Sequence, residues 1–195
     1  MTDGRLVFVT GSPAEASRSS RLSKELERLV RQRGSVDAQA FSVHEFDAQS
    51  VWSADTASRD VQRFIRAVEE SDGIVLSTPV YKATYAGALK SVVDLIPQDA
   101  LVDKVALAIA TGRRAEHLES IRTAFDALFG FFRVGHVVPG IFASDESIFA
   151  DAEKTAFSAS SNAELARAAG ELSAWLGETK ARRAKVEGDA LGARG

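Results

Sequence analysis

Short apolar runs alternate with segments of helical periodicity along most of this 195-residue chain. The apolar runs that predict strands lie at 6–9, 36–43, 73–77, 104–110 and 136–143. Apolar residues recur at helical spacing between them, over 20–34, 58–71, 86–95 and 115–132. Such an alternation predicts a parallel sheet whose strands are joined by right-handed helical crossovers.

Five parallel strands connected by helices favour a three-layer α/β/α architecture with the flavodoxin-like strand order 2-1-3-4-5. We expect one domain over residues 1–176, which ends in a helix at 163–176 after an irregular stretch at 144–162. The remaining segment, 177–195, is rich in Gly, Ala, Arg and Lys and has little to bury. It is therefore predicted to be a disordered tail.

In a sheet of this kind, a ligand binds beyond the carboxyl ends of the strands, at the point where the strand order reverses. The loops expected at that point are 10–20, 78–87 and 111–117. A binding site is therefore predicted where these three loops meet.

The first of these loops is rich in hydroxyl groups. Thr10-Gly11-Ser12-Pro13 leads into Ser17, Arg18, Ser19 and Ser20, immediately before a helix. The first turn of a helix has backbone N–H groups without helical partners, and its dipole favours negative charge. The serines add hydroxyl donors and Arg18 adds charge, while neither G-x-x-x-x-G-K-[ST] nor G-x-G-x-x-G is present. The loop therefore predicts a cradle for a phosphomonoester rather than for a nucleoside triphosphate or a pyrophosphate.

The other two loops leave alternatives open. The second contains Tyr81 and Tyr85, the only two tyrosines of the chain, which either form flat walls for a planar aromatic ligand or cap the core. The third contains Gly112, which permits a close approach of the backbone, followed by Arg113 and Arg114. These arginines either attract a phosphorylated second substrate or are ordinary surface residues at a loop tip.

Composition argues against several classes of function. The chain has no cysteine, and its three histidines are far apart in sequence, so no metal site is expected. A net charge of −3 argues against a nucleic-acid partner. No apolar run approaches the length of a membrane span and no signal peptide is recognisable, so a cytoplasmic protein is expected. The chain shows no Gly-x-Ser-x-Gly elbow and no general-base dyad, which suits a flavin because a flavin supplies its own reactive atoms.

Three parts of the chain resemble the NADPH-dependent FMN reductases of flavodoxin-like fold, most of all those that serve alkanesulfonate monooxygenases. The matching segments are GSPAEASRSS, SDGIVLSTPVYKATYAGALKSVVDLIP, and ALAIATGRRAEHL with VVPGIFASD, so the likeness covers roughly residues 5–150. The resemblance implies an NAD(P)H:FMN oxidoreductase that uses FMN with NADPH or NADH and passes a hydride from the nicotinamide to the flavin. It also implies a partner, a flavin-dependent monooxygenase, that receives the reduced FMN.

The resemblance assigns the site loop by loop. The FMN phosphate is expected to contact Ser12, Ser17, Arg18 and Ser19. The isoalloxazine ring is expected along Pro79, Val80, Tyr81 and Lys82, and its other edge with the nicotinamide near Thr111, Gly112 and Arg113. No side chain receives a catalytic role, because the hydride passes between the two bound molecules.

Three positions depart from the family pattern. Ala14 stands where the family loop often has Arg, which leaves Arg18 as the only cation expected at the phosphate. The third loop of the family often reads Thr-Gly-Gly, and Arg113 stands at the place of the second Gly. A bulky cation there is expected to change the nucleotide preference or to cover part of the flavin. Thr123 lies near the place of a helix tyrosine that some alkanesulfonate-type members carry.

Two other functions fit the same fold. One is a reductase that retains its flavin and passes electrons from NAD(P)H to quinones, azo dyes or another small acceptor. The other is a flavodoxin-like electron carrier, which the modest net charge and the GSPAEASRSS loop disfavour.

The helix at 115–132 predicts an oligomer. It carries more aromatic surface than one thin layer is expected to bury, in Phe125, Phe129, Phe131 and Phe132, and the helix after the second loop is strongly apolar as well. A homodimer or a homotetramer is therefore expected. The alternative is that the helix at 115–132 simply covers the sheet.

Overall fold

The computed structural model describes residues 4–34, 36–113, 115–150 and 155–192. Its strands are β1 (Gly4–Thr10), β2 (Val36–Ser42), β3 (Gly73–Tyr81), β4 (Thr84–Tyr85), β5 (Val105–Gly112), β6 (His136–Ser144), β7 (Ile148–Ala150) and β8 (Thr155–Phe157). Its α-helices are α1 (Arg18–Arg33), α2 (Ala48–Trp52), α3 (Arg59–Glu70), α4 (Gly87–Val93), α5 (Ala115–Phe131) and α6 (Ala159–Gly192). Each predicted strand and helix is present, although most bounds differ by a few residues. The stretch predicted to be irregular contains the β7–β8 hairpin.

Five strands form one parallel sheet in the order β2-β1-β3-β5-β6. Because β4 is a short antiparallel addition to β3, this arrangement is the predicted order 2-1-3-4-5, and the flavodoxin-like fold is confirmed. β7 and β8 form a separate antiparallel pair. The strand order reverses between β1 and β3, so the carboxyl ends of these strands mark the switch point.

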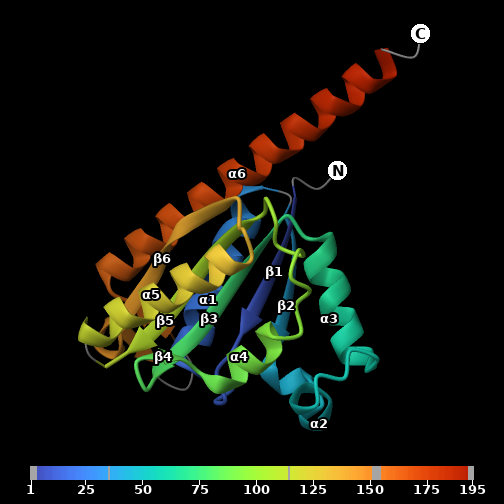
Figure 1. Ribbon diagram of the computed structural model, residues 1–195. Helices are drawn as coiled ribbons and strands as arrows, with labels where there is room; N and C mark the ends of the chain where they lie inside the picture. The colour runs from blue at the N-terminus through green and yellow to red at the C-terminus, as the bar shows by residue number, and fades with distance from the viewer. Residues whose placement is uncertain (1–3, 35, 114, 151–154, 193–195) are drawn as a thin grey trace.

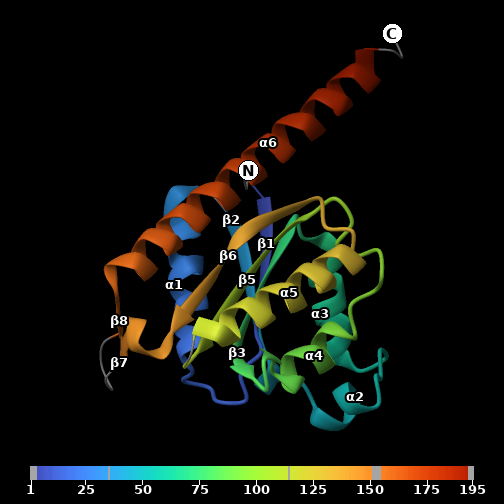
Figure 2. The ribbon, with the colours of Figure 1, turned by 60° about the vertical axis from the view of Figure 1, so that its left-hand side comes forward.

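Helices cover both faces of the sheet, as Figure 1 and Figure 2 show. On one face, α3, α4 and α5 bury Phe64, Leu89 and Phe125 against the strands. On the other face, α1 and α6 bury Leu26 and Leu172. β5 is buried along its whole length, as expected for a parallel strand covered from both sides. The predicted three layers are therefore confirmed.

β6 forms one edge of the sheet, and Pro139 interrupts it. The pairing of β6 with β5 shifts between Leu107 and Ile109, whose partners on β6 are Val138 and Ile141. Proline has no backbone N–H to donate, so it fits an edge strand or a bulge, as the sequence predicts.

α6 runs without a break from Ala159 to Gly192 and projects beyond the sheet (Figure 1). The sequence predicts disorder over 177–195, so the structure differs from that prediction over 177–192. The last buried position described on the helix is Leu176. However, Ala, Glu, Lys and Arg dominate 178–187, and these residues have high intrinsic helix propensity. Residues 193–195 lie outside the described part of the chain.

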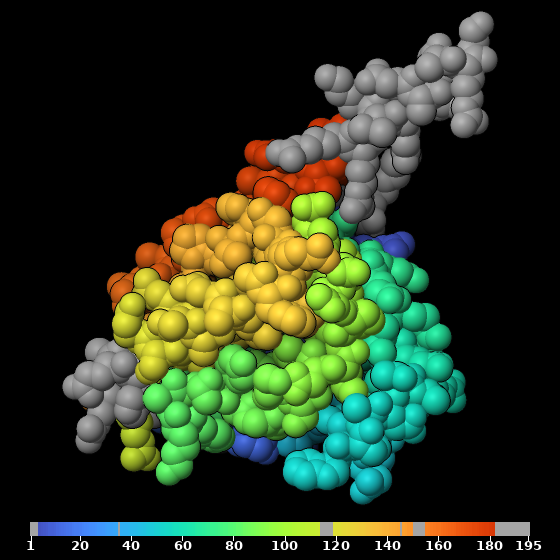
Figure 3. All heavy atoms as spheres, viewed as in Figure 1, coloured from blue at the N-terminus to red at the C-terminus, as the bar shows by residue number. Residues whose placement is uncertain are grey.

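Most of the phenylalanines that predict an oligomer are buried within a single chain. Phe125, Phe129 and Phe132 belong to the core between α5 and the sheet, whereas Phe131 is 59% exposed. Figure 3 shows α5 and β6 side by side on this face of the molecule. One exposed side chain is a weaker reason for an interface than four, and the homodimer or homotetramer stays a prediction.

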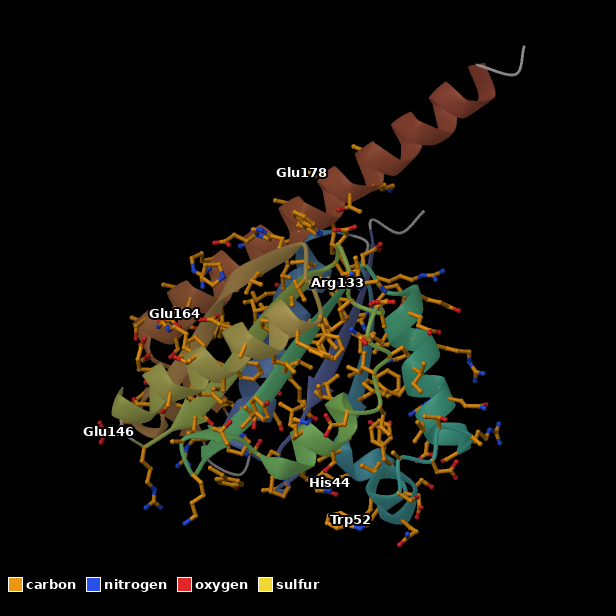
Figure 4. All side chains as sticks on the ribbon, viewed as in Figure 1. His44, Trp52, Arg133, Glu146, Glu164 and Glu178 are labelled. Carbon is orange, nitrogen blue, oxygen red and sulfur yellow. The ribbon has the colours of Figure 1, made fainter. Side chains whose placement is uncertain are left out.

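The described histidines do not form a cluster. His136 stacks on Trp175 with ring centroids 4.8 Å apart, which is a packing role. His44 lies near Trp52 beside α2, at the opposite end of the molecule from the projecting α6 (Figure 4). Within the described ranges, no group of three or more His, Cys, Asp or Glu residues is placed to hold a metal ion. None of the helices described here is long and apolar enough to cross a membrane.

Candidate functional site

A cavity of about 750 Å³ opens at the predicted switch point, beyond the carboxyl ends of β1, β3 and β5. Its described lining residues are Ser12, Ala14, Ala16, Ser17, Arg18, Arg21, Pro79, Val80, Tyr81, Thr111, Gly112, Arg113 and Ile148. All three loops named from the sequence contribute to it. The volume falls within the range of about 300–1,000 Å³ that is typical of small-molecule sites.

All but two of the predicted site residues line this cavity. Ser19 is fully buried behind the first loop, where its Oγ lies 3.1 Å from Ser17 Oγ, so it supports the loop instead of lining the cavity. Lys82 lies exposed at the tip of the β3–β4 hairpin, outside the lining, because β3 continues to Tyr81 before the chain turns. Arg114, the second arginine of the third loop, lies outside what the structure describes.

Ser17 organises the start of α1. It is the N-cap residue, and its Oγ accepts a hydrogen bond from Ser20 N at 3.1 Å. The same oxygen lies 2.7 Å from Ser20 Oγ and 3.1 Å from Ser19 Oγ, so three hydroxyl groups form one connected network. This arrangement fixes the orientation of the helix start, where the dipole and the first-turn N–H groups favour an anion.

The loop before α1 is held tightly against its neighbours. Gly11 N donates to Ser77 O at 2.8 Å, which joins the ends of β1 and β3. A Cβ at Gly11 would lie 2.3 Å from Leu89 Cβ, so α4 packs directly on the loop backbone. Ser12 is buried, and its Oγ accepts from Ala14 N at 3.1 Å. The Ser12 hydroxyl therefore keeps its own hydrogen for a further acceptor.

The second wall of the cavity is the end of β3 with its hairpin to β4. The turn residues are Lys82 and Ala83, whose φ angles of 52° and 65° fit the two positive values of a type I′ turn. At the base of the hairpin, the buried Thr78 Oγ1 accepts from Ala86 N and donates to Pro79 O, each at 2.9 Å. The sequence predicts a plain loop over 78–87, which the hairpin replaces.

The two tyrosines have different roles, so each of the alternatives left open by the sequence applies to one of them. Tyr81 lines the cavity and is 48% exposed. Tyr85 packs against Phe125 with ring centroids 5.5 Å apart and so caps the core. Only Tyr81 is placed to meet a planar ligand.

Cationic side chains dominate the charge of the cavity. Arg18, Arg21 and Arg113 line it, and none of its described lining residues is an Asp or a Glu. Ser12, Ser17 and Thr111 add hydroxyl groups to the lining. Such a cavity favours a ligand that carries a negative group.

The sequence does not single out three of the lining residues, Ala16, Arg21 and Ile148. Arg21 had a local signal: α1 begins at Arg18, two residues earlier than predicted, and residues three apart in a helix share a face. Ile148 had none, because it reaches the cavity through the β7–β8 hairpin, in a stretch that shows no periodicity.

The sequence profile of the NADPH-dependent FMN reductase family matches residues 5–148, a range that includes every described lining residue of the cavity. The chain belongs to this family. An FMN reductase (NADPH) of Pseudomonas putida KT2440 is 36% identical over 152 residues, which are 77% of each chain. The NADH-dependent FMN reductase SfnF of Pseudomonas putida is 33% identical over 147 residues, which are 73% of this chain and 78% of SfnF.

Solved structures agree with this assignment. The apo form of the NADH:FMN oxidoreductase EMOB superposes with a TM-score of 0.79 at 26% identity, over 87% of this chain and 88% of that one. An oxidoreductase from Corynebacterium diphtheriae gives a TM-score of 0.77 at 27% identity, over 90% and 97% of the two chains. The predicted family is thereby confirmed, together with the class of enzyme, NAD(P)H:FMN oxidoreductase, and its two cofactors.

Proposed function

We propose that this protein binds FMN in the cavity described above, reduces it with NAD(P)H, and releases reduced FMN to a flavin-dependent monooxygenase. The observation that carries the proposal is the composition of the cavity. Three arginines and three residues with aliphatic hydroxyl groups line it, and none of the described lining residues is a carboxylate. The aromatic side chain of Tyr81 lines it as well, from the end of β3. A ligand with an anionic tail and a planar ring system fits such a lining.

The residues fit the phosphate of FMN at the first loop. Arg18 and the Ser17 hydroxyl lie at the start of α1, and Ser12 contributes a second hydroxyl from the same loop. These donors are already held in place by the bonds within the loop, so little reorganisation is needed when a phosphate binds.

The residues fit the ring of FMN at the second and third loops. Pro79, Val80 and Tyr81 form one wall, and Gly112 lies against it, since a Cβ at Gly112 would be 3.4 Å from the Val80 side chain. The chemistry that bound flavin supplies is acceptance of a hydride from the nicotinamide. The protein's own task is to hold the isoalloxazine and nicotinamide rings face to face and to prevent other arrangements of the two rings. Arg113, exposed at the mouth, is proposed to meet the phosphates of the nicotinamide coenzyme.

Release of reduced flavin is supported by the openness of the ring end. Tyr81 is 48% exposed and Arg113 is exposed as well, so the cavity opens to the surface at this end. The alternative function, a reductase that retains its flavin, differs only in that the reduced flavin is not released. Gel filtration of the protein with an equimolar amount of FMN separates the two, because a flavin-retaining enzyme elutes yellow.

The phosphate assignment is tested by Arg18→Ala. Loss of a charge-assisted hydrogen bond costs about 1.5–3 kcal/mol, or roughly a tenfold to hundredfold increase in the Kd for FMN. Riboflavin lacks the phosphate, so its Kd is expected to stay unchanged. Titrations of both flavins, followed by quenching of flavin fluorescence, check this result. An unchanged Kd for FMN in the variant contradicts the assignment of the phosphate to the first loop.

A further inference from the structure

Arg21 is the cation of the cavity that neither the sequence nor the family resemblance assigns. It follows Arg18 by three positions on α1, so both side chains leave the same face of the helix start. Both line the cavity, and the loop residues Ala14 and Ala16, which also line it, contribute no charge.

A hydrogen bond from a distant part of the chain holds Arg21 in place. Its Nη1 donates to Thr155 Oγ1 at 2.6 Å, across 134 positions of sequence. Thr155 begins β8, and its partner strand β7 supplies Ile148, a buried residue that closes the cavity beside the arginines. The β7–β8 hairpin therefore contributes Ile148 to the cavity wall, while Thr155 lines a neighbouring groove and reaches Arg21 from that side.

No carboxylate in the part of the chain that the structure describes neutralises the charge of Arg21. Among the described residues, no Asp or Glu oxygen is found within salt-bridge distance of its guanidinium, and its hydrogen-bond partner is the neutral Thr155. The nearest candidate along the helix, Glu25, is engaged by Arg28, whose two nitrogens lie 2.8 and 2.5 Å from the Glu25 oxygens. That hydrogen bond is also the main cause of the raised pKa of Arg28.

A guanidinium group has five N–H donors in a planar fork, and Thr155 accepts from one of them. The remaining donors suit two oxygens of a phosphate group, which is the geometry in which arginine binds phosphate best. Because Thr155 orients the fork while adding no negative charge, the contact positions Arg21 without weakening its attraction for an anion.

We propose that Arg21 is a second phosphate-binding residue of the flavin site and that Thr155 is its positioning residue. This inference rests on the proposed function of the cavity. It assigns the phosphate of FMN two arginines from the same face of the first turn of α1. It also gives the β7–β8 hairpin a role in selecting FMN over flavins that lack a phosphate.

The first test compares FMN with riboflavin in Arg21→Ala. The Kd for FMN is expected to rise about tenfold to a hundredfold, and the Kd for riboflavin to stay as in the wild type. Lys24→Ala is the matched control, because Lys24 is the next cation on α1 and lines a neighbouring groove but not the cavity. The control is expected to bind both flavins as the wild type does.

The second test separates positioning from general structure. Thr155→Val keeps the shape of the side chain and removes the hydroxyl, and it is expected to raise the Kd for FMN about twofold to tenfold. Thr155→Ser keeps the hydroxyl and is expected to restore the affinity. The double variant Arg21→Ala/Thr155→Val is expected to bind FMN no more weakly than Arg21→Ala, because Thr155 acts through Arg21.

Each outcome bears on one of the two proposals. A wild-type protein that binds FMN no better than riboflavin overturns the proposed flavin site as a whole. A wild type that prefers FMN, with the same preference in Arg21→Ala, overturns the role of Arg21 alone. If Arg21→Ala does not fold, as judged by its thermal midpoint, Thr155→Val against Thr155→Ser decides the question in its place. Equal FMN affinities of Thr155→Val and Thr155→Ser then overturn the role of Arg21.

Discussion

The two ends of the cavity are built in different ways. At the phosphate end, Ser12, Ser19 and Ser20 are buried, and Ser17 connects a network of hydroxyl groups at the start of a long helix. At the ring end, a two-residue turn carries positive φ angles, and Tyr81 stands half exposed at its edge. One end is held by many buried contacts, and the other is a short hairpin fixed at its base by Thr78.

This difference indicates a division of labour. Preorganised donors bind an anion with little loss of conformational freedom, so the phosphate end is expected to determine affinity and the choice between FMN and riboflavin. An exposed hairpin with few buried contacts is expected to open more readily, so the ring end is expected to determine how a flavin ring and a nicotinamide are placed and released. Three substitutions test this comparison, beyond those at Arg18, Arg21 and Thr155.

Gly11→Ala is expected to have the largest effect. The added Cβ would lie 2.3 Å from Leu89 Cβ, and both backbones are fixed, so α4 or the phosphate loop has to move. Overpacking of this kind costs about 1–3 kcal/mol, and FMN affinity is expected to fall as well. Chemical denaturation and FMN titration measure the two effects. Gly87→Ala is the control, since a Cβ there meets nothing within 4 Å, and a comparable loss in both variants would contradict the tight packing of the first loop.

Tyr81→Ala is expected to act on both flavins alike. Loss of an aromatic contact is worth about 0.5–1.5 kcal/mol, or about a twofold to tenfold rise in Kd. Because the contact is with the ring, riboflavin and FMN are expected to lose the same factor, unlike in the arginine variants. Lys82→Ala, at the exposed tip outside the cavity, serves as the control. If Lys82→Ala lowers FMN affinity as much as Tyr81→Ala does, Lys82 is part of the binding site.

Ala83→Gly is expected to have the smallest effect and to be stabilising. A left-handed backbone conformation, here with φ 65°, costs a residue with a Cβ about 1–2 kcal/mol, whereas glycine avoids that cost but loses more conformational entropy on folding. A net gain of up to about 1 kcal/mol in urea unfolding is expected, with FMN affinity unchanged. Ala88→Gly, within the ordinary backbone of α4, is expected to lose about 0.5–1 kcal/mol instead. If Ala83→Gly also destabilises the protein, the turn is not strained.

Much of the fold could be predicted because its signals are local. The strand order followed from the number of apolar runs and the handedness of crossovers, and Pro139 alone indicated the irregular edge strand. The end of α6 could not be predicted in the same way. Leu176 is the last buried position described on the helix, and the prediction of disorder rested on composition and on the lack of residues to bury, yet α6 continues to Gly192 through residues of high helix propensity.

The candidate site shows the same limit. Serine, arginine and tyrosine in three loops predicted where a phosphate and a ring would lie, but not which way each side chain faces. Ser19 lies behind the loop, where its hydroxyl group meets that of Ser17, and Tyr85 caps the core by packing on the buried Phe125. In the sequence, nothing distinguishes Ser19 from Ser17 or Tyr85 from Tyr81.

The sequence by itself determined the parallel sheet, the switch point and the hydroxyl-rich loop, because periodicity, connection rules and helix starts depend on neighbouring residues. Only the tertiary structure decided that Thr155 holds Arg21 and that Ile148 lines the cavity. The physical reason is distance along the chain. A contact across 134 positions exists only once α1 and the β7–β8 hairpin have packed together, and no local pattern encodes it.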